Sequence, residues 1–135
     1  MRAVLDPNVI VSAVLSRGGS PAKVLRSWIE GAYELVVSPA LLDELARELQ
    51  YPKITARVAP DEAEELLDLL RRHAEVVDDA TMDLAVTSPD PDDGYLIALG
   101  AKAKAVIVSG DSDLLGLAER IPVLSPAEFL HRLTD

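Results

Sequence analysis

The sequence predicts an α/β fold, in which a parallel sheet is covered by helices on both faces, in a single domain spanning residues 1–135. Short apolar runs alternate with segments of helical spacing along the whole chain, which is the pattern of parallel strands joined by helices. Ser-Pro pairs at Ser20, Ser38 and Ser125 supply repeated helix starts. With 49% hydrophobic but only 4% aromatic residues, the composition indicates one ordered core built mainly from Leu, Val, Ile and Ala.

The first half of the chain contains two predicted strands and three predicted helices. The run "RAVLD" is typical of a buried strand, and it passes into the helical segment "NVIVSAVL" without a glycine between them, so Asp6 stands at the strand's carboxyl end. In "SPAKVLRSWIEG" we expect Ser20 as the N-cap, Pro21 as the first helical residue and Gly31 as the stop. The stretches "YELVVS" and "SPALLDELARELQY" predict the second strand and the third helix.

The second half continues the same alternation. After "PKITARVA", which fits a short helix or a loop, a helix begins at Pro60 with acids in its first turn and arginines in its last. The short run "EVVD" fits a third strand, and the polar, Pro-rich residues 79–92 fit a loop. The helix "DGYLIALGAKA" is apolar around most of its circumference, which predicts a central position. "AVIVSGDSDLLGLA" and "IPVLSPAEFLHRL" each predict a strand followed by a helix.

Charge and cysteine content limit the classes of function. The net charge of −10, from 23 acidic and 13 basic residues, argues against broad nonspecific attraction to nucleic acid. Without cysteine, a bound metal would have to use oxygen ligands or the two histidines. Asp6, Pro7 and Asn8 interrupt the first apolar run too early for a signal peptide or a membrane span, so we expect a cytoplasmic protein.

Two acids are expected at the same edge of the sheet. Asp6 ends the first strand and Asp111 follows the fourth, after "VIVSG". Functional groups in parallel sheets gather at the carboxyl ends of the strands. Each aspartate alone could simply cap a helix, but the two together favour a functional site.

A second group of acids lies in "SPDPDDGYLIALG". Asp92 and Asp93 directly precede the apolar helix, whereas Asp90 fits the loop before it. Not all of them can cap one helix, and carboxylates crowded beside an apolar segment raise one another's pKa unless a cation compensates. This crowding favours a metal site.

A further acid could come from the helix "SPALLDELARELQY". Its buried face, drawn through the leucines and Ala46, spans about 140°, and Glu44 falls about 60° outside it while Glu48 falls about 20° outside it. Helical geometry therefore does not choose between Glu44 and Glu48, and a solvated flank is an equally good interpretation of either residue.

Oxygen ligands from separate segments suit Mg²⁺ or Mn²⁺, ions that retain water and bind substrate phosphates. Hydrolysis of a phosphodiester by one ion, or by two ions about 4 Å apart, is the corresponding chemistry. Asn8 and Ser109 lie close in sequence to these acids and could orient a carboxylate, although capping or strand-end roles suit them as well. His73 and His131 stand near helix ends beside arginines, where a surface role is expected.

The stretches "VLDPNVIVSAVL", "SPALLDELARELQYPKI", "SPDPDDGYLIALGAKAKAVIVSGDSDLL" and "VLSPAEFL" together resemble the PIN-domain family, and in particular the VapC-like ribonucleases that are toxins of bacterial and archaeal toxin-antitoxin pairs. The resemblance covers essentially the whole chain, in order. It implies a three-layer α/β/α fold with a five-stranded parallel sheet in the order 3-2-1-4-5. It also implies Mg²⁺- or Mn²⁺-dependent cleavage of RNA, a homodimer, and inhibition by a partner antitoxin.

The resemblance assigns catalytic and metal-binding roles to the matching positions, which are Asp6, Glu44, Asp93 and Asp111, with Asn8 and Ser109 as supporting residues. Pro7 replaces the hydroxyl residue that the family carries there, which removes one hydrogen-bond donor. Asp92 is the alternative to Asp93, and Asp113 is an additional ligand or a cap.

Other interpretations fit less well. A response receiver would need an acceptor aspartate after the third strand, where only Asp78 stands, and a lysine after the fifth. A haloacid-dehalogenase-like phosphatase would need a second aspartate in place of Asn8. The stronger alternative is a catalytically idle PIN fold that binds RNA or a protein, which the charge of −10 favours. A nuclease of this charge would rely on local cations, for which the candidates are Arg17, Lys23, Arg26, Lys53 and Arg57.

Overall fold

The computed structural model describes residues 1–79 and 87–134. Its strands are β1 (Arg2–Leu5), β2 (Glu34–Val37), β3 (Glu75–Val76), β4 (Val106–Val108) and β5 (Val123–Leu124). Its helices are α1 (Pro7–Leu15), α2 (Ser20–Ile29), α3 (Pro39–Glu48), α4 (Pro52–Thr55), α5 (Pro60–His73), the 3₁₀ turn η1 (Pro91–Asp93), α6 (Gly94–Ala103), α7 (Ser112–Leu115) and α8 (Pro126–Thr134). The alternation of strands and helices expected from the sequence is therefore confirmed.

The five strands form one parallel sheet in the order β3-β2-β1-β4-β5, as predicted. The central strand β1 pairs with β4 from Ala3 to Leu5, with Leu5 opposite Val108. The pairing is extended by one hydrogen bond, because the backbone N–H of Asp6 donates to the carbonyl of Val108 at 2.9 Å. The carboxyl ends of β1 and β4 are thereby fixed side by side.

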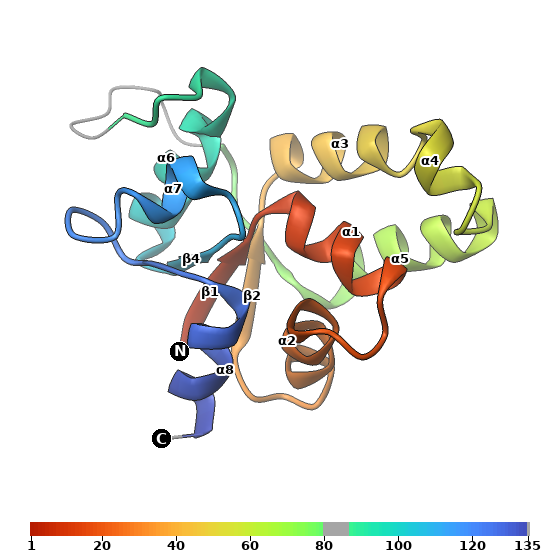
Figure 1. Ribbon diagram of the computed structural model, residues 1–135, viewed down its shortest axis with the longest axis horizontal. Coiled ribbons are helices and arrows are strands. Elements are labelled where there is room, and N and C mark those ends of the chain that lie inside the picture. The colour runs from red at the N-terminus through yellow and green to blue at the C-terminus, as the bar shows by residue number, and fades with distance from the viewer. Residues whose placement is uncertain (80–86, 135) are drawn as a thin grey trace.

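Helices cover both faces of this sheet (Figure 1). Helices α1, α2, α3 and α5 lie on one side, and α6 lies on the other against β1 and β4. The C-terminal helix α8 packs on α2. Within the described ranges, no helix has the length and apolar character needed to cross a membrane.

The core lies between the sheet and these helices and is almost entirely aliphatic, as the composition predicted. Its largest fully buried side chain is Phe129 of α8, whose ring meets Tyr33 edge to face with centroids 4.9 Å apart. The Tyr33 hydroxyl donates to the carbonyl of Val24 at 2.8 Å, which satisfies its one polar group. Helix α6 is buried along most of its length, which confirms its predicted central position.

Two local expectations need correction or restriction. Ser20 is the first residue of α2 instead of its cap, and Gly19 holds the cap position without a side-chain hydrogen bond. The reason is that the carbonyl of Gly19 already accepts the first helical hydrogen bond, from the N–H of Lys23 at 3.2 Å, so the helix begins one residue earlier than expected. Of the loop expected over residues 79–92, residues 80–86 lie outside the described part of the chain, and residues 91–93 form the turn η1.

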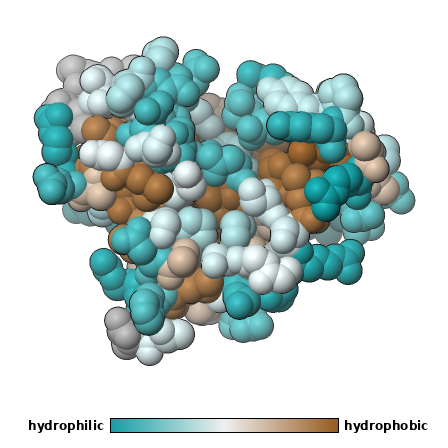
Figure 2. All heavy atoms as spheres, in the orientation of Figure 1, coloured by the Kyte–Doolittle hydropathy of each residue, from teal (hydrophilic) through white to brown (hydrophobic). Residues whose placement is uncertain are grey.

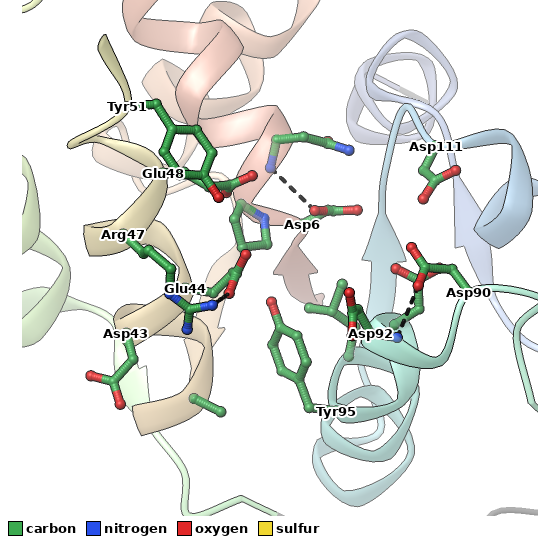
Figure 3. Close-up of a pocket in the computed structure, with 15 residues that line it drawn as sticks. Asp6, Asp43, Glu44, Arg47, Glu48, Tyr51, Asp90, Asp92, Tyr95 and Asp111 are labelled. Atoms are coloured by element: carbon green, nitrogen blue, oxygen red, sulfur yellow. Dashed lines mark hydrogen bonds and ion pairs between the residues drawn. The ribbon is translucent and has the colours of Figure 1, made fainter. Parts of the chain in front are cut away.

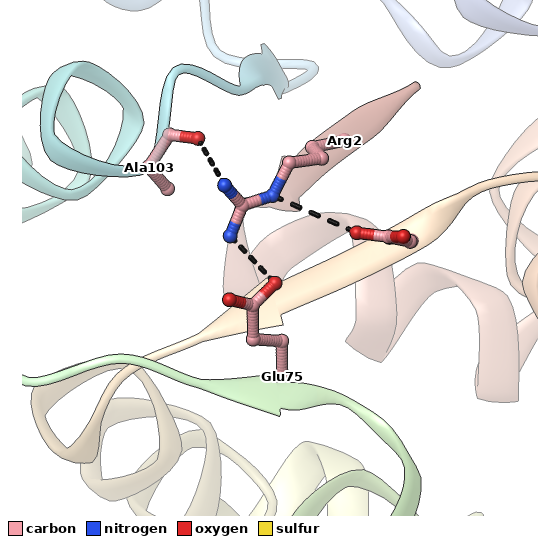
Figure 4. Close-up of polar contacts among 4 residues, drawn as sticks. Arg2, Glu75 and Ala103 are labelled. Atoms are coloured by element: carbon pink, nitrogen blue, oxygen red, sulfur yellow. Dashed lines mark hydrogen bonds and ion pairs between the residues drawn. The ribbon is translucent and has the colours of Figure 1, made fainter.

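Arg2 connects three elements at the amino-terminal edge of the sheet (Figure 4). Its guanidinium donates to the carbonyl of Ala103 at 2.8 Å and forms an ion pair with Glu75, while Nε lies 3.7 Å from Glu34. The side chain is about one-third exposed, so these bonds fix the position of α6 and β3 on the sheet more than they stabilise the fold.

Gly100 allows α6 to approach β4 closely, and we predict that Gly100→Val destabilises the protein by about 2 to 3 kcal/mol through overpacking. A Cβ at this position would lie 2.9 Å from Cγ1 of Ile107, which is buried in the sheet. Thermal unfolding measures the effect, with Gly18→Ala as the control because its Cβ would meet no atom within 4 Å. Equal melting temperatures for Gly100→Val and the wild type would show that α6 does not contact the sheet this closely.

Candidate active site

A cavity of about 610 Å³ opens at the carboxyl edge of the sheet, between α3 on one side and η1 and α6 on the other (Figure 3). Its walls come from four separated segments of the chain, because parallel strands all deliver their following residues to this edge. Most of the lining side chains are acidic: Asp6, Asp43, Glu44, Glu48, Asp90, Asp92, Asp93 and Asp111. The remaining lining residues include Asn8, Arg47, Tyr51 and Tyr95.

Asp6 lies at the base of the cleft and is only 7% exposed. One carboxylate oxygen accepts from the backbone N–H of Asn8 at 3.1 Å, and the other accepts from the Ser109 hydroxyl at 2.8 Å. Asp6 is therefore both the N-cap of α1 and a wall of the cleft, so the two interpretations of this residue do not exclude each other. Burial raises its pKa despite these two bonds, and the negative charges of Asp111 and Glu44 raise it further.

Asp93 lines the same cleft from the start of α6 and is as deeply buried as Asp6. The Ser88 hydroxyl donates to its Oδ2 at 2.8 Å, which fixes its orientation. Burial raises the pKa of Asp93 to about 6, and neighbouring Asp111, Asp90 and Asp6 contribute to that rise. Its side chain makes no capping bond to α6, so the carboxylate is left for the cleft.

A compact group of carboxylates forms where η1 meets the loop after β4. One carboxylate oxygen from each of Asp90, Asp93, Asp111 and Asp113 lies within 4.8 Å of the others. Two of these residues also cap short helical turns, since Asp90 accepts from the N–H of Asp92 and Asp111 from the N–H of Asp113, each at 3.0 Å. Three or more oxygens at such spacing match the ligand sets of hard divalent cations.

Glu44 and Glu48 of α3 form the opposite wall. Glu44 is paired with Arg47 at 2.9 Å, and its side chain is 31% exposed. Glu48 is more enclosed, and among the described residues its Oε2 has no hydrogen-bond partner although that atom is buried. Burial raises the pKa of Glu48 to about 7, with Glu44 and Asp6 adding to the rise. Both glutamates therefore line the cleft, and the geometry of the helix alone could not have chosen between them.

Tyr95 stands between the two walls, with its hydroxyl pointing into the cleft (Figure 3). Burial raises the pKa of this hydroxyl, and the charges of Asp6, Glu44, Glu48 and Asp93 raise it further. It is a neutral hydrogen-bond donor surrounded by carboxylates. The sequence pattern did not single it out, because an aromatic residue in an apolar helix is normally a core residue.

Asp93 and Asp111 belong to the compact carboxylate group, and all four acids to which the family resemblance assigns catalytic roles, Asp6, Glu44, Asp93 and Asp111, line this cleft. Asp92 also lines it but is exposed and lies outside the compact group, whereas Asp113 belongs to that group. Ser109 contacts Asp6 through its hydroxyl, and Asn8 does so through its backbone N–H. His73 and His131 lie in the last turns of α5 and α8 and do not line the cleft.

Besides Tyr95, sequence reasoning missed the contributions of Asp90 and Ser88. Asp90 was expected in the loop, but its oxygen joins the compact carboxylate group. Ser88 orders this segment by donating to Asp93 and accepting from the N–H of Asp90 at 3.2 Å. The "SPD" triplet that opens the acidic stretch was the available signal, because serine and aspartate two residues apart commonly close such turns.

Residues 2–113 match the family model for the PIN domain, so the chain belongs to the PIN-domain family, a family of nucleases. The chain is also 26% identical over 143 residues to the uncharacterized protein MJ1680 of Methanocaldococcus jannaschii, a match covering 97% of this chain and 90% of that protein.

Solved structures share the fold at low sequence identity. PAE2754 from Pyrobaculum aerophilum superposes with a TM-score of 0.67 and 17% identity, over 98% of this chain and 94% of that chain. VapBC2 from Rickettsia felis, bound to a DNA fragment from its promoter, superposes with a TM-score of 0.62 and 16% identity, over 93% of this chain and 98% of that chain. VapBC-1 from nontypeable Haemophilus influenzae superposes with a TM-score of 0.62 and 12% identity, over 94% of this chain and 99% of that chain. These likenesses confirm the predicted fold.

We predict that the metal-free protein loses stability as the pH rises from about 5 to about 8. The folded-state pKa values of Asp93 and Glu48, about 6 and about 7, lie above their ordinary values of 3.8 and 4.5. Groups raised in this way favour the folded state at low pH, and that contribution is lost as the pH passes through the folded-state pKa. Thermal unfolding in EDTA at the two pH values measures it.

Asp93→Asn should reduce this pH dependence, whereas Asp61→Asn, which removes an exposed acid of α5 outside the cleft, should leave it unchanged. If the stability of Asp93→Asn depended on pH as strongly as that of the wild type, the raised pKa of Asp93 would not be a source of the pH dependence.

Proposed function

We propose that this protein is a metal-dependent endoribonuclease that hydrolyses phosphodiester bonds of RNA. The observation that carries the proposal is the convergence of carboxylates from four separate segments in one cleft of a PIN domain, where Asp6 and Asp93 are buried and the pKa values of Asp6, Asp93 and Glu48 are raised. Carboxylates that repel one another serve no purpose in a core, and a bound cation removes the cost of placing them together.

The donor set of the cleft fits Mg²⁺ or Mn²⁺. It consists of carboxylate oxygens, which hard divalent cations prefer, and it contains neither thiolate nor imidazole. Asp6, Glu44, Asp93 and Asp111 would hold the ion, with Asp90 and Asp113 as neighbouring carboxylates and Asp92 as an exposed one at the rim. Such an ion supplies Lewis acidity and lowers the pKa of a water molecule.

The surrounding residues orient these ligands. The Ser109 hydroxyl and the N–H of Asn8 hold the two oxygens of Asp6, and the Ser88 hydroxyl holds Asp93. Arg47 partly neutralises Glu44, which lowers the repulsion within the wall of α3. The Tyr95 hydroxyl points into the cleft, where it would be able to donate a hydrogen bond to the oxygen of a bound phosphate.

We further propose that the protein is the toxin of a toxin-antitoxin pair, acting in the cytoplasm as a homodimer and inhibited by a partner protein. The support is the family resemblance of the sequence and the fold that the chain shares with the VapBC proteins. The alternative is a catalytically idle PIN fold that binds RNA or a protein. Such a protein would require no metal and would have no role for the buried acids.

The first prediction of this proposal is that purified protein cleaves single-stranded RNA with Mn²⁺ and not with EDTA. Asp6→Asn and Asp93→Asn should each lower the rate of cleavage by about 100-fold or more. Each substitution keeps the side-chain volume and removes one charged ligand. Glu65→Gln, which removes an exposed acid of α5, should leave the rate unchanged. Cleavage that is equal in Asp6→Asn and the wild type would remove Asp6 from the site.

A second prediction concerns binding of the ion without turnover. Mn²⁺ should raise the melting temperature of the wild type, because an ion that binds only the folded state stabilises it by mass action. The rise should be smaller for Asp6→Asn and unaltered for Glu65→Gln. Equal rises in all three proteins would mean that the ion binds elsewhere.

A further inference from the structure

A second hollow, of about 480 Å³, adjoins the acidic cleft between α1 and the α3–α4 segment. The two spaces share Asn8, Glu48 and Tyr51 in their walls, so they adjoin one another, and together they are called the groove. Val11, Leu15 and Ile54 give the second hollow an apolar floor. Figure 2 shows hydrophobic side chains gathered over α1, bordered by hydrophilic ones towards α4.

The sign of the charge reverses from one end of this groove to the other. Among the described residues that line the acidic cleft, Arg47 is the one basic side chain, and it is already paired with Glu44. The adjoining hollow carries Lys53 and Arg57, against Glu48 as its acid. In a chain of net charge −10, a phosphate chain beyond the metal site would find its cations here.

Of the five candidate cations named from the sequence, Lys53 and Arg57 line this hollow and the other three do not. Arg26 donates to the backbone carbonyl of Arg17 at 3.0 Å, and neither of these residues nor Lys23 lines the groove. Arg57 is anchored at its rim, because its guanidinium donates to the carbonyl of Leu15 at 3.0 Å. Lys53 is exposed on α4, and its charge acts on the carboxylate of Glu48 where the two spaces meet.

Tyr51 stands at the junction of the two spaces and is 42% exposed, which is unusual for a large aromatic side chain in this protein. It immediately precedes α4, and Pro52 fixes the backbone that follows it. An exposed aromatic ring between an acidic cleft and two cations offers a surface on which an unpaired base can stack.

We propose that this hollow binds the nucleotide that flanks the scissile phosphate of a single-stranded RNA, with Lys53 and Arg57 holding its phosphate and Tyr51 stacking on its base. The inference rests on the proposed nuclease function, because the acidic cleft supplies the position of the cleaved bond. In a duplex each base is stacked between its neighbours and its face is not available to the Tyr51 ring. The groove therefore favours unpaired substrate over duplex.

The test compares steady-state cleavage of a single-stranded RNA of roughly ten nucleotides by paired variants. Lys53→Ala should raise KM about tenfold, as expected for loss of one charged contact, and should change kcat much less. Tyr51→Ala should raise KM about fivefold or more, whereas Tyr51→Phe keeps the stacking ring and should stay within roughly twofold of the wild type. Lys23→Ala removes the same charge from an exposed site on α2 and serves as the matched control.

Binding to the same RNA is measured in parallel by fluorescence anisotropy in the Asp6→Asn protein, at several salt concentrations. Lys53→Ala should reduce the slope of log affinity against log salt by about 0.7, the value for one phosphate contact of a single strand, and Lys23→Ala should leave the slope unchanged.

Three outcomes are distinguishable. Selective effects of Lys53→Ala and Tyr51→Ala support the inference. Cleavage by the wild type with unaltered KM in both variants overturns it while leaving the nuclease intact, and the groove would then be available to a protein partner. A wild type that neither binds nor cleaves RNA contradicts the proposed function itself, and the inference falls with it.

Discussion

The arrangement of the site depends on the junction between the carboxyl ends of β1 and β4. There the carboxylate of Asp6 is held between the N–H of Asn8 and the hydroxyl of Ser109, while its backbone N–H continues the ladder to Val108. The same Ser109 hydroxyl accepts from the N–H of Asp111 at 3.0 Å. One serine thus connects two acids that are far apart in the sequence, and the register of β1 on β4 determines how close they come. The other walls of the cleft are arranged around this pair.

Repulsion among the carboxylates of the cleft destabilises the folded protein and, at the same time, favours the binding of a cation there. Asp6 and Asp93 are buried among like charges, and the raised pKa of each reports the cost of keeping it ionised. The aliphatic core between the sheet and its helices supplies the stability that supports this arrangement. A divalent cation would relieve this repulsion by binding between the carboxylates. The same cluster of negative charges therefore destabilises the metal-free cleft and accounts for its proposed affinity for the ion.

The sequence was sufficient for the fold, because strand and helix periods alternate clearly and Ser38 and Asp111 cap their helices as their positions suggested. It also predicted that Asp6 and Asp111 meet, since parallel strands place their carboxyl ends together. It was insufficient where side-chain direction decides the outcome. Neither the turn that brings Asp90 into the compact group nor the direction of the Tyr95 hydroxyl follows from spacing, and Glu48 faces the cleft although its helical angle was ambiguous. The start of α2 at Ser20 was missed because capping signals define helix ends only to within a residue or two.

The central claim is that the carboxylates at this edge of the sheet form a divalent-metal site. Anomalous diffraction from crystals of the protein grown with Mn²⁺ tests it most directly, because the ion is located without reference to activity. The account predicts an anomalous peak in the cleft, in contact with Asp6 and with at least one of Asp93 and Asp111. A cleft free of anomalous signal at saturating Mn²⁺, or a peak bound only by surface carboxylates elsewhere, would contradict it.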